Sequence, residues 1–113
     1  MDCLFCRIAE KKIPARIIHE DELAVAFEDV NPQAPVHFLV IPKKHIATLL
    51  DFGAEDDALM GHLYRLAAKL AAQKGIAQSG FRTLVNCNRD AGQSVFHIHL
   101  HVLGGRAMAW PPG

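Results

Sequence analysis

Apolar residues recur along the chain with helical spacing in two places. Between Ala54 and Lys74 four leucines fall every three or four residues, the spacing of one helix face: Leu59, Leu63, Leu66 and Leu70. Acidic residues at 55–57 and the Lys74-Gly75 pair suit the two ends of this long helix. Apolar positions 4, 5 and 8 predict a shorter helix over Asp2–Lys12, which Pro14 ends.

Runs rich in β-branched and aromatic residues predict five strands. These are Ala15–Glu20, Leu23–Glu28, His37–Ile41, Phe81–Asn88 and Val95–Leu103. The proline-containing segment 31–35 and the segment 88–94 are expected to be loops. Short links between most strands favour an antiparallel meander with the helices packed on one face. The expected fold class is therefore α+β, a five-stranded antiparallel meander sheet with one long and one short helix.

Composition fits one globular domain over residues 1–113, half apolar and 21% charged. The 12 basic and 12 acidic residues cancel, which argues against a nucleic-acid binder and a polybasic membrane-surface protein. No apolar run reaches the ~20 residues of a membrane span, and the first residues lack the apolar region of a signal peptide. Three cysteines, an odd and low number, do not indicate a disulfide framework. We expect a cytoplasmic protein with no nucleic-acid or membrane partner.

Three of the seven histidines alternate with apolar residues in His97-Ile98-His99-Leu100-His101. Because residues two apart in a strand share a face, the three imidazoles should line one face. Phe96, Ile98, Leu100 and Val102 should enter the core on the other. Three interpretations are open: a tri-histidine metal site, a nucleophilic histidine flanked by two that handle its protons, or a polar face that happens to be histidine-rich.

A small glycine-containing loop, residues 90–95, comes just before these histidines. Such a loop can direct backbone N–H groups at a phosphate, with Gln93 and Ser94 adding donors. Phosphate donors beside a histidine suit phosphoryl or nucleotidyl transfer, which depends on positioning and charge stabilisation. A bare metal site would not need the loop.

The segment Gly92–Leu103 resembles the His-x-His-x-His signature of the histidine-triad (HIT) family. The segment Asp29–Ile46 and the pieces Gly104-Gly105-Arg106 and Trp110-Pro111-Pro112-Gly113 are similar to the Hint branch of that family, the purine nucleoside phosphoramidases. The resemblance covers nearly the whole chain. It implies a homodimer joined through the long helix and the Phe81 strand, with the tail near Trp110 close to the partner's site.

The resemblance also implies a mechanism in which His99 is the nucleophile. It would attack the α-phosphorus of a nucleoside 5′-phosphoramidate, and water would cleave the nucleotidyl-histidine. His101 would contact the phosphate or leaving group, His97 would orient His99 partly through its carbonyl, and Ser94 would lie near the leaving amine. His37 would support the triad, although by position alone it could equally be a satisfied core histidine. No metal is needed for catalysis in the family.

The implied nucleotide site has a carboxylate, an apolar slot and a phosphate loop. Asp29 would accept both ribose hydroxyls, although without the family it would be assigned to a turn. Leu4, Phe5, Ile8, Phe27 and Val30 would line the base pocket, and such residues can equally be plain core. Asn86, Gly92, Gln93, Ser94 and Val95 would surround the phosphate, beside His99 and His101. An apolar slot accepts adenine or guanine, so the sequence does not separate AMP-type from GMP-type ligands.

Cys3 and Cys6 have the C-x₂-C spacing that lets two thiolates share one metal. Zinc-bearing family members take two further ligands from positions that correspond to His45 and His97. The four would form a closed, structural Cys₂His₂ zinc site. The alternative is a pair of small residues on a short helix that has lost the metal.

The function expected from the sequence is hydrolysis of purine nucleoside 5′-phosphoramidates. Two other classes stay open: a nucleotide-binding or protein-interaction module with vestigial turnover, and a tri-histidine metalloenzyme.

Overall fold

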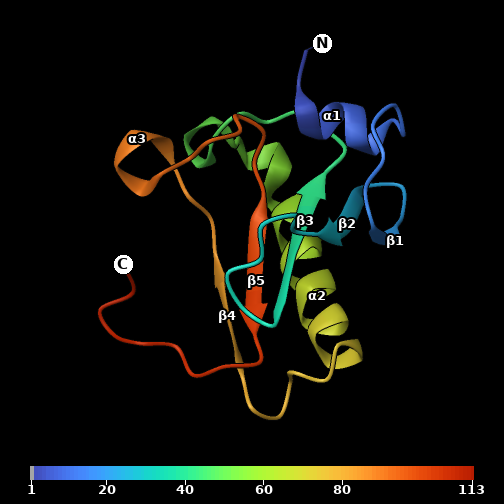
Figure 1. The fold of residues 1–113 in the computed structure, drawn as a ribbon. Coiled ribbons are helices and arrows are strands. Elements are labelled where there is room, and N and C mark those ends of the chain that lie inside the picture. Colours follow the sequence, from blue (N-terminus) through green and yellow to red (C-terminus); the bar gives the residue numbers. More distant parts are fainter. Residues whose placement is uncertain (1) are drawn as a thin grey trace.

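The structure is a computed structural model that describes residues 2–113. One antiparallel sheet of five strands forms its centre: β1 (Ile17–Glu20), β2 (Ala24–Glu28), β3 (Val36–Pro42), β4 (Phe81–Leu84) and β5 (Leu100–Gly104). Figure 1 shows β3 and β5 side by side in its middle. The predicted α+β class and the five antiparallel strands are confirmed.

The strand order, β1-β2-β3-β5-β4, departs from a strict meander. β5 lies between β3 and β4, so that His101 pairs with Leu39 on one side and with Leu84 on the other. Most side chains of β5 are buried, whereas those of β4 are exposed or half-buried. The more apolar strand therefore gains most from the central place, and the more polar one tolerates the edge.

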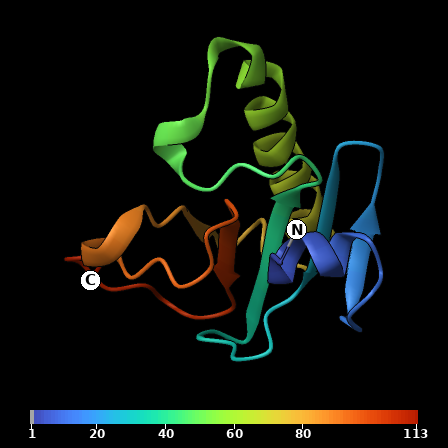
Figure 2. The same ribbon diagram turned by 90° about the horizontal axis from the view of Figure 1, so that it is seen from above.

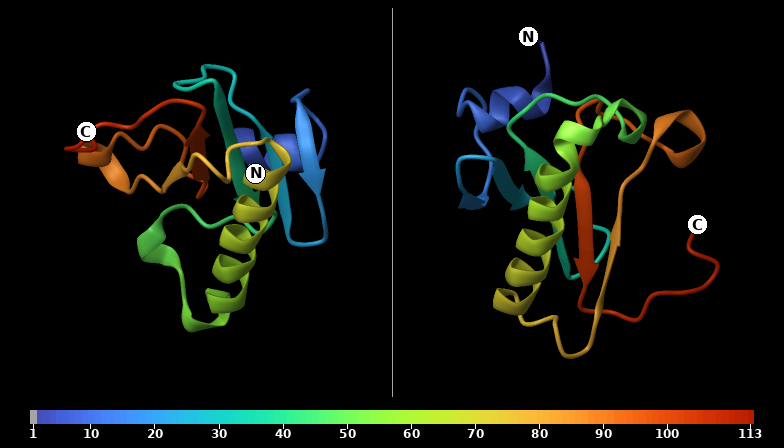
Figure 3. Two further views of the ribbon diagram at one scale, coloured as in Figure 1. Left: turned by 90° about the horizontal axis from the view of Figure 1, so that it is seen from below. Right: turned by 180° about the vertical axis from the view of Figure 1, so that it is seen from behind.

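The long helix α2 (Asp57–Gln73) covers one face of the sheet, as the right panel of Figure 3 shows from behind. Its buried leucines pack on Phe38 and Val40 of β3 and on Leu100 and Val102 of β5. The predicted start at Ala54 is instead a 3₁₀ turn over Ala54–Asp56, and a second 3₁₀ turn spans Leu49–Asp51.

The short helix α1 (Leu4–Ala9) packs on the opposite face, where Phe5 and Ile8 meet Phe27 and Leu39. The expectation of helices on one face was therefore wrong, because successive residues of β2 are buried on both sides of the sheet. In the view from above, α1 lies near the N-terminus, well apart from most of α2 (Figure 2). The helix is shorter than Asp2–Lys12 because Cys3 caps it and Lys11 takes a positive φ of 62°.

The segment before β5 is not part of the sheet, although the alternation predicted a strand from Val95. The N–H of Ile98 donates to Ile46 O at 2.7 Å instead of to a neighbouring strand. Phe96, expected in the core, is half exposed, whereas Ile98 is buried as expected. The strand predicted to reach Asn88 ends at Leu84, because β5 offers no pairing beyond that point.

The expected loop at 88–94 contains one helical turn, α3 (Asn88–Ala91). The Gln93 side chain stabilises the turn by accepting the Asn88 N–H at 2.8 Å. No helix within residues 2–113 is long and apolar enough to cross a membrane. The cytoplasmic location stays a prediction.

Asp21 closes the β1–β2 hairpin and links it to α2. One carboxylate oxygen accepts the N–H groups of Leu23 and Ala24 at 2.8 and 2.9 Å. The other accepts from Nε2 of His19 at 2.9 Å and from Nε2 of His62 at 2.8 Å. Burial acts to raise the pKa of Asp21, but these four bonds outweigh it and hold the pKa well below its ordinary value.

We expect Asp21→Asn to lower the free energy of unfolding by about 1–3 kcal/mol at pH 7, because an amide cannot accept all four bonds. Stability from a carboxylate with a lowered folded-state pKa is present above its unfolded value of about 4 and is lost as the pH falls below it. Urea unfolding should show the full difference in free energy of unfolding between wild type and Asp21→Asn at pH 6–7. This difference should become smaller below about pH 4. Exposed Glu22→Gln is the control, and equal stability of Asp21→Asn and wild type at pH 7 would contradict the assignment.

Candidate functional site

A pocket of about 420 Å³ opens between α1, the sheet and the loop after α3. Twelve of the residues expected to bind nucleotide line it: Leu4, Phe5, Ile8, Phe27, Asp29, Val30, Asn86, Gly92, Ser94, Val95, His99 and His101. The walls near α1 are apolar, and the imidazoles and Asn86 form a polar side. Segments far apart in sequence therefore converge on one cavity.

The prediction missed a second stretch of wall, Ile13, Pro14 and Ala15, together with Glu28 and Leu39. The sequence indicated Pro14 only as the end of the helix, and no local signal placed this connecting segment over the pocket. A hollow of about 660 Å³ adjoins it and shares part of its lining, Pro14, Ala15, Glu28, Asp29 and Val30, but neither His99 nor His101 lines it.

Gln93 does not belong to the pocket lining. Its buried amide donates to the carbonyls of Ala47 and Val95, at 2.8 and 3.2 Å, and accepts the Asn88 N–H. The N–H groups of Gly92 and Gln93 also donate within the turn, to carbonyls of α3. The structure therefore places Gln93 as a support of the loop, and the polar group that the loop presents at the pocket is the exposed Ser94.

His99 lies buried at the pocket and is held from behind. Its Nδ1 donates to the carbonyl of His97 at 2.8 Å, because a carbonyl can only accept. The Nε2 of a neutral His99 then keeps its lone pair. Phe5 packs edge-on against the ring at 5.0 Å between centroids. Burial lowers the pKa of His99, which favours the neutral ring.

His37 and His101 form a directed hydrogen-bond pair beside His99. His37 is 6% exposed, and its Nδ1 accepts the backbone N–H of Gln33 at 3.0 Å. The proton of His37 is therefore on Nε2, which faces Nδ1 of His101 at 2.9 Å and a carboxylate oxygen of Asp29 at 3.3 Å. His101 accepts at Nδ1 and so carries its own proton on Nε2.

Both rings of this pair favour the neutral form. Burial lowers the pKa of His37. Burial, together with repulsion from His99 and His37, lowers the pKa of His101 to about 4. At neutral pH both hydrogen bonds therefore point toward the pocket: the Gln33 N–H donates to His37, and His37 donates to His101.

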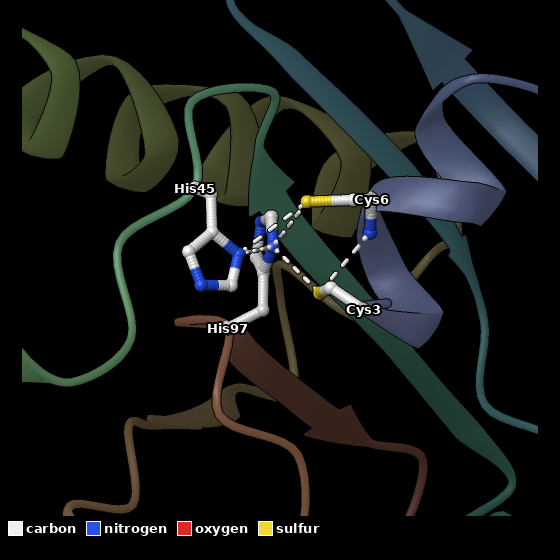
Figure 4. Close-up of side chains that lie close together, drawn as sticks. All are labelled: Cys3, Cys6, His45 and His97. Atoms are coloured by element: carbon white, nitrogen blue, oxygen red, sulfur yellow. Dashed lines mark hydrogen bonds between the residues drawn. The ribbon is translucent and has the colours of Figure 1, made fainter. Parts of the chain in front are cut away.

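A second cluster lies behind the pocket, where Cys3, Cys6, His45 and His97 point toward one another (Figure 4). Nδ1 of His97 is 3.3 Å from the Cys3 sulfur, 3.4 Å from the Cys6 sulfur and 3.2 Å from Nδ1 of His45. The Cys6 sulfur is 3.4 Å from Nδ1 of His45. Tetrahedral zinc, with Zn–S of about 2.3 Å and Zn–N of about 2.0 Å, separates its ligand atoms by roughly 3.3–3.8 Å.

The surroundings of the cluster suit a cation. Nε2 of the fully buried His97 donates to Pro42 O at 2.8 Å, so its Nδ1 lone pair faces the other three donors. Metal-bound histidines are commonly held in this way by a carbonyl on the second nitrogen. Burial and neighbouring Cys3 raise the pKa of the Cys6 thiol to about 11, which a bound cation would reverse. The four residues therefore fit a metal ion.

Asp29, His37 and His101 also lie close enough together for a metal, but their hydrogen bonds disfavour one. Nε2 of His37 would have to lose its proton while Nδ1 still accepts from Gln33 N–H. The three triad imidazoles likewise do not converge, since both nitrogens of His97 face the cluster and Pro42, and His99 donates to the carbonyl of His97. The tri-histidine metal site is therefore wrong.

A model of the HIT domain matches residues 10–108, most of the chain. The chain belongs to the HIT family. An uncharacterized HIT-like protein of Synechococcus elongatus is 53% identical over 112 residues, which are 99% of this chain and 97% of that protein. A HIT family hydrolase from Legionella pneumophila has a TM-score of 0.98 and 51% identity, covering 99% of this chain and 100% of its own. A zinc-bound histidine triad family protein from Mycobacterium smegmatis has a TM-score of 0.80 and 37% identity, covering 94% and 76%.

Proposed function

We propose that this HIT protein hydrolyses purine nucleoside 5′-phosphoramidates through a nucleotidyl-histidine formed on His99. The observation that carries the proposal is the fixed proton of His99. Its Nδ1–H is donated to the His97 carbonyl at 2.8 Å, and Nε2 is left as a nucleophile beside a nucleotide-sized pocket. Similarity to a protein described as a HIT family hydrolase supports the same reaction class.

The pocket divides into three parts that suit a nucleotide. Apolar side chains of α1 and β2, among them Phe5 and Phe27, would hold either purine. Asp29 would accept the ribose hydroxyls with its carboxylate, which now accepts the Asn31 N–H at 2.8 Å. Asn86 and Ser94 would meet the phosphate on the side of the pocket that His99 lines.

The proposed reaction has two displacements at phosphorus. Nε2 of His99 forms a bond to the α-phosphorus as the phosphorus–nitrogen bond of the substrate breaks, and the amine leaves with a proton supplied within the site. His101, with its proton on Nε2, would contact the phosphate or the departing nitrogen. Water then attacks the phosphorus and releases a proton that replaces the one taken by the amine, the nucleotidyl bond to His99 breaks, and the nucleoside monophosphate and the free histidine result.

We expect His99→Ala to keep the fold and AMP binding but to lose at least about 10³-fold in turnover of a fluorogenic adenosine phosphoramidate, because the covalent nucleophile is gone. Mass spectrometry of wild type quenched during turnover should place an acid-labile nucleotide on His99 alone. The melting temperature and AMP titration serve as controls for folding.

Wild-type turnover in His99→Ala would overturn the mechanism. A wild-type protein that binds AMP tightly without measurable turnover, and whose binding survives loss of His99, would instead support the nucleotide-binding or interaction module. Chelator-sensitive turnover would point to metal chemistry.

We further propose that Cys3, Cys6, His45 and His97 hold a structural zinc ion. The site has four protein donors and no open position, so the ion would supply cross-linking of α1 to the segment before β5 rather than a reactive centre. The zinc-bound relative from Mycobacterium smegmatis supports the choice of metal.

We expect about one zinc per chain in protein purified without chelator, measured by inductively coupled plasma mass spectrometry. Cys3→Ser/Cys6→Ser should lose the zinc and melt at a lower temperature, because its binding free energy is available only to the folded chain. Cys87→Ser, which changes the third cysteine, should retain it. Less than about a tenth of an equivalent in folded, active wild type would contradict the site.

We also propose a homodimer that uses the free edge of β4 and the exposed side of α2. β4 is an edge strand, and an unpaired edge can pair with another chain. Phe81 on β4 and Tyr64 on α2 are 36% and 44% exposed. A two-fold dimer is the commonest closed assembly and would leave β1, at the other edge, free.

We expect light scattering at micromolar concentration to give twice the chain mass of 12.4 kDa. Tyr64→Asp should shift the protein toward the monomer by at least about tenfold in dissociation constant, since it places a charge in the contact. Leu23→Asp is the matched control, because Leu23 is 50% exposed at the β1–β2 end of the sheet, on the opposite side from the β4 edge. A wild-type monomer, or equal effects of both variants, would contradict this interface.

A further inference from the structure

The Gly104-Gly105-Arg106 segment at the end of β5 has no role in the proposed reaction. Its arginine nevertheless contacts the loop that precedes His37. Nη2 and Nε of Arg106 both donate to the carbonyl of Gln33, at 3.0 and 3.2 Å. The remaining Nη1 donates to Ala107 O at 3.1 Å. One guanidinium thus joins the segment after β5 to the loop before β3.

Backbone packing brings Arg106 to this loop. Gly105 has a φ of +88°, and a Cβ there would lie 2.9 Å from Cβ of Pro35. Gly104 pairs with Val36 at the end of the β3–β5 ladder, so the two segments leave the sheet together. Position 105 therefore requires glycine, because its backbone lies so close to Pro35. The same close packing brings Arg106 within hydrogen-bond distance of Gln33.

Gln33 is the point where the arginine meets the site. Arg106 holds its carbonyl, its side-chain amide donates to Asn31 O at 3.0 Å, and its backbone N–H donates to Nδ1 of His37 at 3.0 Å. His37 in turn faces Nδ1 of His101 with Nε2 at 2.9 Å. Hydrogen bonds on both sides of the Gln33 backbone therefore link Arg106 to a ring that lines the pocket.

We propose that Arg106 is a positioning residue for the site: by clamping Gln33 it keeps the Gln33 N–H on His37 and so fixes the tautomers of His37 and His101. Without the clamp, His37 can place its proton on Nδ1. Its Nε2 then presents a lone pair to His101, which must move its own proton to Nδ1 and turn a lone pair toward the pocket. The consequence for turnover rests on the proposed phosphoramidase activity, whereas the tautomers do not.

The fork geometry explains why an arginine stands here. Two N–H groups of one planar guanidinium reach the same oxygen, while a lysine ammonium is a compact donor on a flexible stem. Arg106 itself is exposed, so its removal is expected to leave the core intact. Its effect should therefore appear in proton placement more than in stability.

The test compares Arg106→Gln and Arg106→Lys with Arg82→Gln. Arg82 is the matched control, because its guanidinium also holds the tail, through Ala109 O at 3.2 Å, without touching Gln33. Since Arg82 lies on β4, light scattering must show that Arg82→Gln keeps the oligomeric state of wild type. Nitrogen-15 NMR of histidine-labelled protein reports which ring nitrogen carries the proton. We expect a single Nε2–H form of His37 in wild type and Arg82→Gln, a mixture in Arg106→Gln, and a smaller mixture in Arg106→Lys.

Kinetics with the fluorogenic phosphoramidate give the second measurement. We expect kcat to fall by about ten- to a hundredfold in Arg106→Gln while KM stays within about twofold, as for a misplaced catalytic group. Wild-type tautomers in Arg106→Gln, or equal changes in Arg82→Gln, would overturn the proposal. Because the NMR experiment needs no substrate, altered tautomers in a protein that proves inactive toward phosphoramidates would uphold the clamp and refute only the proposed function.

Discussion

The fully buried imidazole of His97 is the constraint on which the rest of this structure depends. A polar ring without exposure is costly unless its nitrogens are satisfied, and here Pro42 O takes one and the cysteine-histidine cluster faces the other. Its own carbonyl then receives the Nδ1 proton of His99. The N-terminal helix, the end of β3 and the histidine segment are thereby joined at one residue, and the His99 ring is oriented by the same backbone.

Two backbone groups give two buried histidines opposite characters. The Pro42 carbonyl requires a proton on Nε2 of His97, which leaves the Nδ1 lone pair for a cation. The Gln33 N–H requires a lone pair on Nδ1 of His37, which makes Nε2 a proton donor toward His101. The rings are chemically identical, so the peptide group beside each one decides whether a lone pair faces the cysteine-histidine cluster or a proton faces His101.

The two faces of the sheet are packed differently, and this difference lets the fold tolerate the free-energy cost of burying the histidines. The face under α2 is a continuous apolar core, which carries most of the burial. The face under α1 has a smaller apolar cluster and can therefore hold the histidines and leave a pocket beside them. The histidines and the pocket therefore lie on this second face.

Helical spacing of apolar residues predicted α1 and α2, and runs of β-branched and aromatic residues predicted the five strands, because burial favours these patterns in any sequence that forms such elements. The family motif added twelve residues of the pocket lining. Contacts between distant segments determined the rest. β5 lies between β3 and β4, the Gln93 side chain bonds its own loop, and Pro14 forms part of the pocket wall. The donor direction of each buried histidine, and the reach of Arg106 to Gln33, were also settled only in three dimensions. Local sequence carries no information about which peptide group from another strand or loop will face a given ring, and that partner determines where the proton resides.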